Sequence, residues 1–228
     1  MAETKTRPTR IYVVRHGETA WNRDSLFRGR ADVPLNEKGR LQVDALGRRL
    51  GPVRLSAIYS SPLGRALQTA EAILRHQSGG GERPAQPPLV IVEEAFSDPD
   101  VGLLEGLDVD QAREQYPDFF RTWRDEPQRC RFPGGDSLPD ALHRSAGALD
   151  RVVRAHPGEA VAIATHRVIC KMLVFAALGL GLESFWRLGQ QTACLNIIEG
   201  VPGALGTVLV NDTCHLREGN LAPLPTDI

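Results

Sequence analysis

Basic side chains suited to holding a phosphate group follow short runs of β-forming residues at three places in the chain. Arg15 and His16 come directly after the apolar run at residues 11–14. Arg65 lies in the first turn of an expected helix after a second run, and His166 begins a helix after a third. Guanidinium groups offer paired N–H donors that match phosphate oxygens, and an imidazole can act as a nucleophile. These residue types together indicate a phosphate pocket.

The elements that must position these residues alternate between strands and helices. Strands are expected at residues 10–14, 55–60, 89–92, 160–164, 194–199 and 207–210. Helices are expected at residues 37–50, 62–76, 137–156 and 167–179, with two short ones at 108–116 and 117–125. This alternation predicts an α/β sandwich around a mostly parallel sheet. Ligands of such sheets bind at the carboxyl ends of the strands, where the basic residues stand.

Local signals predict where the helices begin. Asn36 is a good N-cap for the first long helix. Ser61 is expected to cap the helix that carries Arg65, and Thr165 the helix that begins at His166. The free N–H groups and positive dipole end of such helix starts favour a bound anion.

The composition fits one globular domain at residues 10–217, with flexible tails at residues 1–9 and 218–228. The chain has 228 residues, of which 42% are hydrophobic, enough for a sizeable core. Its net charge of −1 and the lack of a Lys/Arg run argue against nucleic-acid or membrane partners. The 4 cysteines are widely spaced and form no CxxC pair. We therefore expect a cytoplasmic protein with free thiols.

Each basic residue also has a purely structural interpretation. His16 alone fits a hydrogen-bonded core histidine, Arg65 a helix surface residue, and His166 an ordinary first helical residue. A metal site is the other functional interpretation of two histidines, but neighbouring arginines would repel a cation. The placement of all these residues after three separate strands favours phosphate chemistry, with no metal.

Four stretches of the chain resemble the motifs of one known family. They are VVRHGETAWN, SSPLGRALQTAE, PGGDSL and AIATHRVICKML. As a set they resemble the histidine phosphatase superfamily, in its phosphoglycerate mutase-like branch. The resemblance implies a three-layer α/β/α sandwich and a phosphatase that acts on a small phosphorylated metabolite without a cofactor. A homodimer is compatible with the resemblance, although the sequence does not reveal the oligomeric state.

The resemblance also implies roles for individual residues. His16 is the expected nucleophile, which becomes phosphohistidine and passes its phosphoryl group to water. The catalytic residues implied are His16, Asp98 and His166, and the substrate-binding residues are Arg15, Arg65, Asn22, Gly17, Thr19 and Gly29. His16 must react through a neutral ring nitrogen, and a backbone carbonyl near Gly17 can hold the proton on the other one.

The general acid is expected in the loop after the third strand. In the family it lies four residues before a glycine, and here that spacing from Gly102 gives Asp98. Relatives more often carry Glu at this position, so Glu94 and Asp100 remain alternatives.

Two features depart from the family pattern. Arg167 stands where the family usually has Gly, either at the pocket mouth or on the helix surface. Mutases tend to carry an Arg-Arg pair after the residue equivalent to Trp123, whereas this chain has Arg124 and Asp125. This favours a phosphatase over a 2,3-bisphosphoglycerate-dependent phosphoglycerate mutase. An inactive phospho-ligand binding protein is a third alternative, although the four central basic residues are all present.

The resemblance leaves several substrate classes open: small sugar phosphates, phosphoglycerate derivatives, α-ribazole phosphate and phosphopeptides. Five aromatic residues are candidates for an apolar lid over the pocket, although core positions are the commoner role for them. They are Phe27, Phe96, Phe119, Phe120 and Trp123. Gln190 and Thr192 are candidates for the pocket edge.

Overall fold

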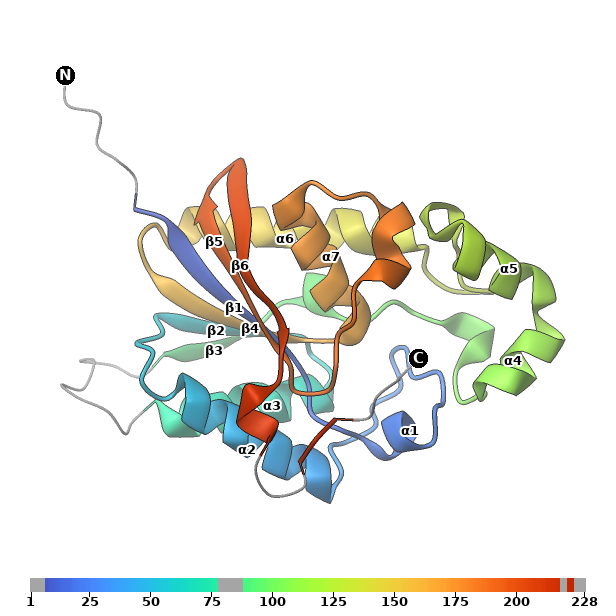
Figure 1. Cartoon of the computed structure of the whole chain (residues 1–228), viewed down its shortest axis with the longest axis horizontal. Coiled ribbons are helices and arrows are strands. Elements are labelled where there is room, and N and C mark those ends of the chain that lie inside the picture. Colours follow the sequence, from blue (N-terminus) through green and yellow to red (C-terminus); the bar gives the residue numbers. More distant parts are fainter. Residues whose placement is uncertain (1–6, 78–87, 218–220, 224–228) are drawn as a thin grey trace.

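A six-stranded sheet forms the centre of the computed structural model, which describes residues 7–77, 88–217 and 221–223. In chain order the strands are β1 (Thr9–Arg15), β2 (Ala57–Ser60), β3 (Leu89–Val92), β4 (Ala160–Thr165), β5 (Leu195–Val201) and β6 (Ala204–Asp212). Their order across the sheet is β3-β2-β4-β1-β5-β6 (Figure 1). The first four in that order are parallel, and β5 and β6 are antiparallel to their neighbours. The predicted mostly parallel sheet is confirmed.

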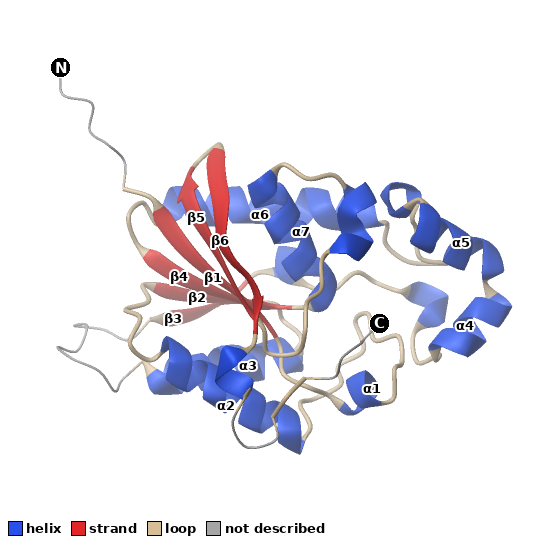
Figure 2. Cartoon of the chain, in the orientation of Figure 1, coloured by secondary structure: helices blue, strands red, loops and turns tan. Residues whose placement is uncertain are grey.

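Helices cover both faces of this sheet. The long helices are α2 (Glu37–Leu50), α3 (Gly64–His76), α6 (Leu138–Ala155) and α7 (Arg167–Leu178). In Figure 2, α2 and α3 lie on one side of the strands, and α6 and α7 lie on the other. The arrangement is the predicted three-layer α/β/α sandwich.

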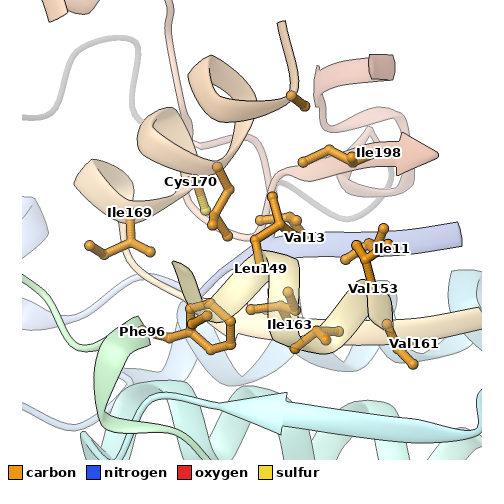
Figure 3. Close-up of a cluster of buried hydrophobic side chains, with 14 of the residues drawn as sticks. Ile11, Val13, Phe96, Leu149, Val153, Val161, Ile163, Ile169, Cys170 and Ile198 are labelled. Atoms are coloured by element: carbon orange, nitrogen blue, oxygen red, sulfur yellow. The ribbon is translucent and has the colours of Figure 1, made fainter. Parts of the chain in front are cut away.

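The uninterrupted apolar run of β1 serves two cores, because successive side chains of a strand point to opposite faces. Ile11 and Val13 belong to the cluster that includes Leu149 of α6 (Figure 3). Tyr12 and Val14 belong to the cluster on the α2–α3 face. A strand buried on both faces holds its last residue firmly, and the last residue of β1 is Arg15.

Two of the three predicted helix caps are wrong. Asn36 accepts a hydrogen bond from the Gly39 N–H at 2.7 Å, as predicted. The helix expected from residue 62 begins instead at Gly64, with no side-chain cap. Thr165 is the last residue of β4, and its hydroxyl donates to the Phe96 carbonyl at 2.6 Å. The hydroxyl groups of Ser61 and Thr165 make tertiary contacts instead, which local sequence patterns do not reveal.

Short elements flank the carboxyl ends of the strands. They are α1 (Ala20–Arg23), α4 (Val109–Gln115), α5 (Pro117–Asp125) and the 3-10 helices η1 (Glu94–Phe96), η2 (Gly102–Leu104), η3 (Pro127–Arg129), η4 (Leu182–Arg187) and η5 (Cys214–Leu216). Figure 1 shows α4 and α5 extending to one side of the sandwich, away from the strands. The aromatic residues of α5 pack with Phe185 of η4 in a separate apolar cluster.

β1 begins at Thr9, one residue earlier than expected, and the Thr9 side chain is buried. The predicted tails lie largely outside the described residues, as do residues 78–87. None of the helices in the described part of the chain is both long and apolar enough to cross a membrane.

Candidate active site

Two neighbouring strand ends bring the two central histidines together. β1 and β4 are parallel neighbours, and Arg15 pairs in register with Thr165. The residues that follow, His16 and His166, therefore leave the sheet side by side. Their ring centroids lie 5.3 Å apart. We call Arg15, His16, Arg65 and His166 the basic cluster.

His16 is held as a neutral imidazole. Its Nδ1 lies 2.7 Å from the Gly17 carbonyl oxygen, which can only accept, so Nδ1 carries the proton and Nε2 keeps its lone pair. The pKa of His16 is lowered well below its usual value by burial, and further by the charges of Arg65 and Arg15. The backbone carbonyl that we expected near Gly17 to hold this proton is that of Gly17 itself.

His166 is held by a hydrogen bond at Nε2, whereas His16 is held at Nδ1. Its Nε2 lies 2.8 Å from the Ser61 hydroxyl, and both residues are fully buried. Its Nδ1 is buried and has no hydrogen-bond partner among the described residues. Burial, then the charge of Arg65 and that of Arg15, lower its pKa well below the usual value. A buried nitrogen without a partner is costly unless a ligand engages it.

The two arginines of the basic cluster are anchored by backbone carbonyls. Arg15 donates to the Gln190 carbonyl oxygen at 2.6 Å, and its side chain is fully buried. Arg65 donates to the carbonyl oxygens of Ala31 at 2.7 Å and Gly29 at 2.9 Å. Burial lowers the pKa of Arg65 to about 10, so it stays charged at neutral pH. Fixed, buried cations of this kind favour a bound anion.

The remaining predicted binding residues also make contacts within the protein. A Cβ at Gly17 would lie 2.5 Å from the Gly39 carbonyl oxygen, so Gly17 allows close packing on α2. Thr19 caps α1, and its hydroxyl donates to Asn22 Oδ1 at 2.8 Å. The Thr19 hydroxyl thus has a local partner, and its contact with substrate stays a prediction. Gly29 contributes the carbonyl that binds Arg65, at a φ of 48° that favours glycine.

Among the three candidate acids, Asp98 is the one beside the basic cluster. Its Oδ2 lies 3.7 Å from Arg65 Nη2, and 13% of its side chain is exposed. Burial raises the pKa of Asp98, against the opposing charge of Arg65. Asp100 Oδ1 accepts from the Gly102 N–H at 2.8 Å, and Glu94 accepts from Ser97. The place of Asp98 beside Arg65 and its raised pKa agree with the predicted role of proton donor.

The sequence reasoning missed Arg28. This residue is 7% exposed and donates to the carbonyls of Trp21 and Leu26 at 3.2 and 3.3 Å. Its charge contributes to the lowered pKa values of His16 and His166. One signal in the sequence could have found it, because Arg28 directly precedes Gly29, a predicted pocket residue.

A side pocket opens next to the basic cluster. It is lined by Phe27, Arg28, Gly29, Asp98, Pro99, Val101, Trp123, Phe132, Arg167 and Val168. Arg167 therefore lies at the pocket, the first of its two predicted locations. The Arg167 guanidinium carbon lies 5.9 Å from the Trp186 ring centroid.

The predicted aromatic lid divides between pocket and core. Phe27 and Trp123 line the side pocket, whereas Phe96 belongs to the sheet core. Phe119 and Phe120 pack against Trp123, with ring centroids 5.6 and 5.5 Å away.

The other expected edge residues have different surroundings. The Gln190 side chain binds Asn196, and its carbonyl anchors Arg15. Thr192 is buried. Arg124 pairs with Asp125 on an exposed surface, so the mutase-like arginine clamp is not assembled there.

Comparisons with known proteins agree with the family resemblance. A family model described as the histidine phosphatase superfamily, branch 1, matches residues 11–213. The chain is 33% identical over 209 residues to phosphoserine phosphatase 1 of Hydrogenobacter thermophilus, and the match covers 92% of this chain and 95% of that protein. It is 32% identical over 189 residues to the probable phosphoglycerate mutase GpmB of Cronobacter sakazakii, and the match covers 83% of this chain and 84% of that protein. The solved structure of Bacillus stearothermophilus YhfR matches with a TM-score of 0.82 at 32% identity, and the match covers 91% of this chain and 98% of that one.

Proposed function

Because the chain belongs to the histidine phosphatase superfamily, whose members transfer phosphoryl groups through a phosphohistidine, we propose that His16 is the residue phosphorylated here. The observation that carries this assignment is the pairing of His16 Nδ1 with the Gly17 carbonyl. It leaves Nε2 unprotonated in a site rich in fixed positive charge, which is what an in-line attack on phosphorus requires.

In the first half-reaction, His16 Nε2 attacks phosphorus while the bond from phosphorus to the ester oxygen breaks. Arg15, Arg65 and His166 surround the phosphoryl oxygens and offset their charge in the transition state. The leaving oxygen takes the proton of Asp98, whose raised pKa favours the protonated form.

In the second half-reaction, the Asp98 carboxylate takes a proton from water as the water oxygen attacks phosphorus. The bond from phosphorus to His16 Nε2 breaks, the electron pair returns to the ring, and inorganic phosphate leaves. The chain's own residues supply each proton transfer and the positive charge of this scheme, so we expect activity in the presence of EDTA.

The substrate proposed is a small phosphorylated metabolite. The relative named phosphoserine phosphatase 1 supports this class. The relative named as a probable phosphoglycerate mutase keeps a mutase as the second candidate. The exposed Arg124–Asp125 pair favours water over a second sugar-acid hydroxyl as the acceptor.

Trapping of the phosphoenzyme tests the assignment. The protein is mixed with a ³²P-labelled phosphate monoester in EDTA, quenched, and its label tested in acid and in alkali. Label that is lost in acid and kept in alkali identifies phosphohistidine. We expect His16→Ala to lose the label and to lose about 10⁴-fold or more in kcat/KM, whereas His143→Ala, at an exposed histidine, keeps both. Full labelling of His16→Ala would contradict the proposal.

A further inference from the structure

The side pocket lies where the leaving group of a substrate must be. It shares Arg28, Gly29 and Asp98 with the surroundings of the basic cluster. Asp98 is 3.7 Å from Arg65 on one side and lines the side pocket on the other. A group that protonates the leaving oxygen stands between the phosphoryl group and the rest of the substrate. The side pocket is therefore the space next to the departing oxygen.

The charge of this lining is positive when Asp98 is protonated. Its ionisable residues are Arg28, Arg167 and Asp98. Arg28 comes from the loop after α1, and Arg167 from the first position of α7. A phosphoryl group alone is already served by Arg15 and Arg65, so two further guanidinium groups suit a second negative charge.

The rest of the lining is apolar and suits a carbon skeleton. Phe27, Trp123 and Phe132 provide aromatic surface, and Val101 and Val168 provide aliphatic surface. Water-poor walls strengthen a hydrogen-bonded ion pair between a guanidinium and an anion. The Trp186 ring beside Arg167 further limits where its guanidinium can lie.

We infer that the side pocket selects phosphate monoesters whose leaving group carries a second anion, a carboxylate or a second phosphate, and that Arg167 is the specificity-determining residue that binds it. This inference rests on the proposed function for the position of the phosphoryl group. Arg167 replaces the glycine that the resemblance predicts at this position, so the second-anion preference belongs to this chain's own residues.

A matched set of esters tests the inference. Phenyl phosphate, 4-carboxyphenyl phosphate and 1,4-phenylene bisphosphate share one ring and differ in the far group. Glycerol 3-phosphate and 3-phosphoglycerate form an aliphatic pair that differs by a carboxylate. We expect wild type to prefer the doubly anionic member of each set in kcat/KM. In Arg167→Gln that preference falls by about 10-fold or more, because a charge-assisted pair is lost.

The controls separate specificity from folding and from turnover. Arg154→Gln removes an exposed arginine on α6 and leaves the preference unchanged. Arg167→Lys keeps the charge without the planar fork and retains part of the preference. Circular dichroism and the melting temperature confirm that each variant folds. Equal losses on singly and doubly anionic esters in Arg167→Gln would overturn the inference.

Binding keeps the test independent of catalysis. Benzylphosphonate and 4-carboxybenzylphosphonate are titrated calorimetrically into wild type and Arg167→Gln. Tighter binding of the carboxylated probe, lost in Arg167→Gln, supports the subsite even if no ester is hydrolysed, which would refute only the proposed function. Equal affinity of both probes for wild type refutes the subsite, whether or not His16 is phosphorylated. A preference for the carboxylate but not for the second phosphate among the esters would assign the anion.

Discussion

The basic cluster and the side pocket adjoin each other but are built in different ways. The basic cluster stands on the ends of buried parallel strands, and backbone carbonyls hold its arginines. The side pocket is formed by residues from loops, from α5 and from the start of α7. A site on a packed sheet can be shared by many substrates, because it contacts only the phosphoryl group. The loop-built pocket contacts the part that distinguishes one ester from another.

The largest effect is expected from breaking the basic cluster. Arg65→Met removes a fixed cation that offsets phosphoryl charge, so kcat/KM should fall by about 10³-fold or more on every ester tested. The loss should be the same for singly and doubly anionic esters, unlike that of Arg167→Gln. Steady-state kinetics on the ester set measure this. A loss confined to doubly anionic esters would show that the two sites are not separate in function.

Asp98 lies at the boundary of the two sites, and its loss should depend on the leaving group. Asp98→Asn should lower kcat/KM by about 10²–10³-fold for phenyl phosphate, whose leaving oxygen needs a proton. The loss should be much smaller for 2,4-dinitrophenyl phosphate, whose phenolate leaves without help. Rapid mixing that follows the burst of dinitrophenol measures the first half-reaction alone. Glu94→Gln is the matched control, and equal losses on both esters would exclude Asp98 as the acid.

The dependence of kcat/KM on pH should report the ionisation of His16 and of Asp98. His16 must be neutral, and its lowered pKa places the loss of activity in acid below pH 6.5. Asp98 must be protonated for the first step, and its raised pKa moves the alkaline decline above the usual carboxylate range of about 3.8. A plot of kcat/KM against pH should therefore be bell-shaped, with an acid limb set by His16 and an alkaline limb set by Asp98. The alkaline decline should appear with phenyl phosphate, whose leaving oxygen needs the proton of Asp98, and should be absent with dinitrophenyl phosphate. An equal decline on both esters would contradict the assignment.

The smallest effect concerns Lys171, a buried residue of α7, the helix that also carries Arg167. Lys171 is 1% exposed, donates to the Phe185 carbonyl at 2.8 Å, and has a pKa lowered to about 6 by burial and the charge of Arg167. The unfolded chain holds this proton up to about pH 10.5, so between about pH 6 and 10.5 the unfolded state binds more protons. The contribution of Lys171 to stability thus rises with pH across that window.

Replacing Lys171 should remove this dependence. Lys171→Met should raise the melting temperature near pH 7 by about 2–8 °C, the loss of the hydrogen bond to Phe185 offsetting part of the gain. The difference from wild type should shrink as the pH rises toward 9.5. Calorimetric scans at several pH values, with Arg154→Met as the surface control, measure it. A difference that does not change with pH would show that Lys171 keeps its usual pKa.

Much of the fold follows from patterns that are local in the chain. The apolar run before Arg15 predicts a strand buried on both faces, and Asn36 predicts the start of α2. The confirmed family resemblance rests on short segments of the same kind. The errors arose where a side chain has a distant partner. Ser61 and Thr165 look like helix caps locally, but Ser61 is bound to His166, 105 residues away, and Thr165 to Phe96, 69 residues away.

Local residue patterns were enough to put two imidazoles and two guanidinium groups after strands, because strand runs and helix starts are properties of neighbouring residues. The sequence also contains the spacing that selects Asp98, whose role stays a prediction. The packing of distant segments was needed to show that Arg28 and Arg167 line one pocket with Trp123, and that the Arg124–Asp125 pair lies on the surface. The physical reason is that side-chain direction, burial and mutual charge depend on which loops pack together, and such contacts join residues far apart in the chain.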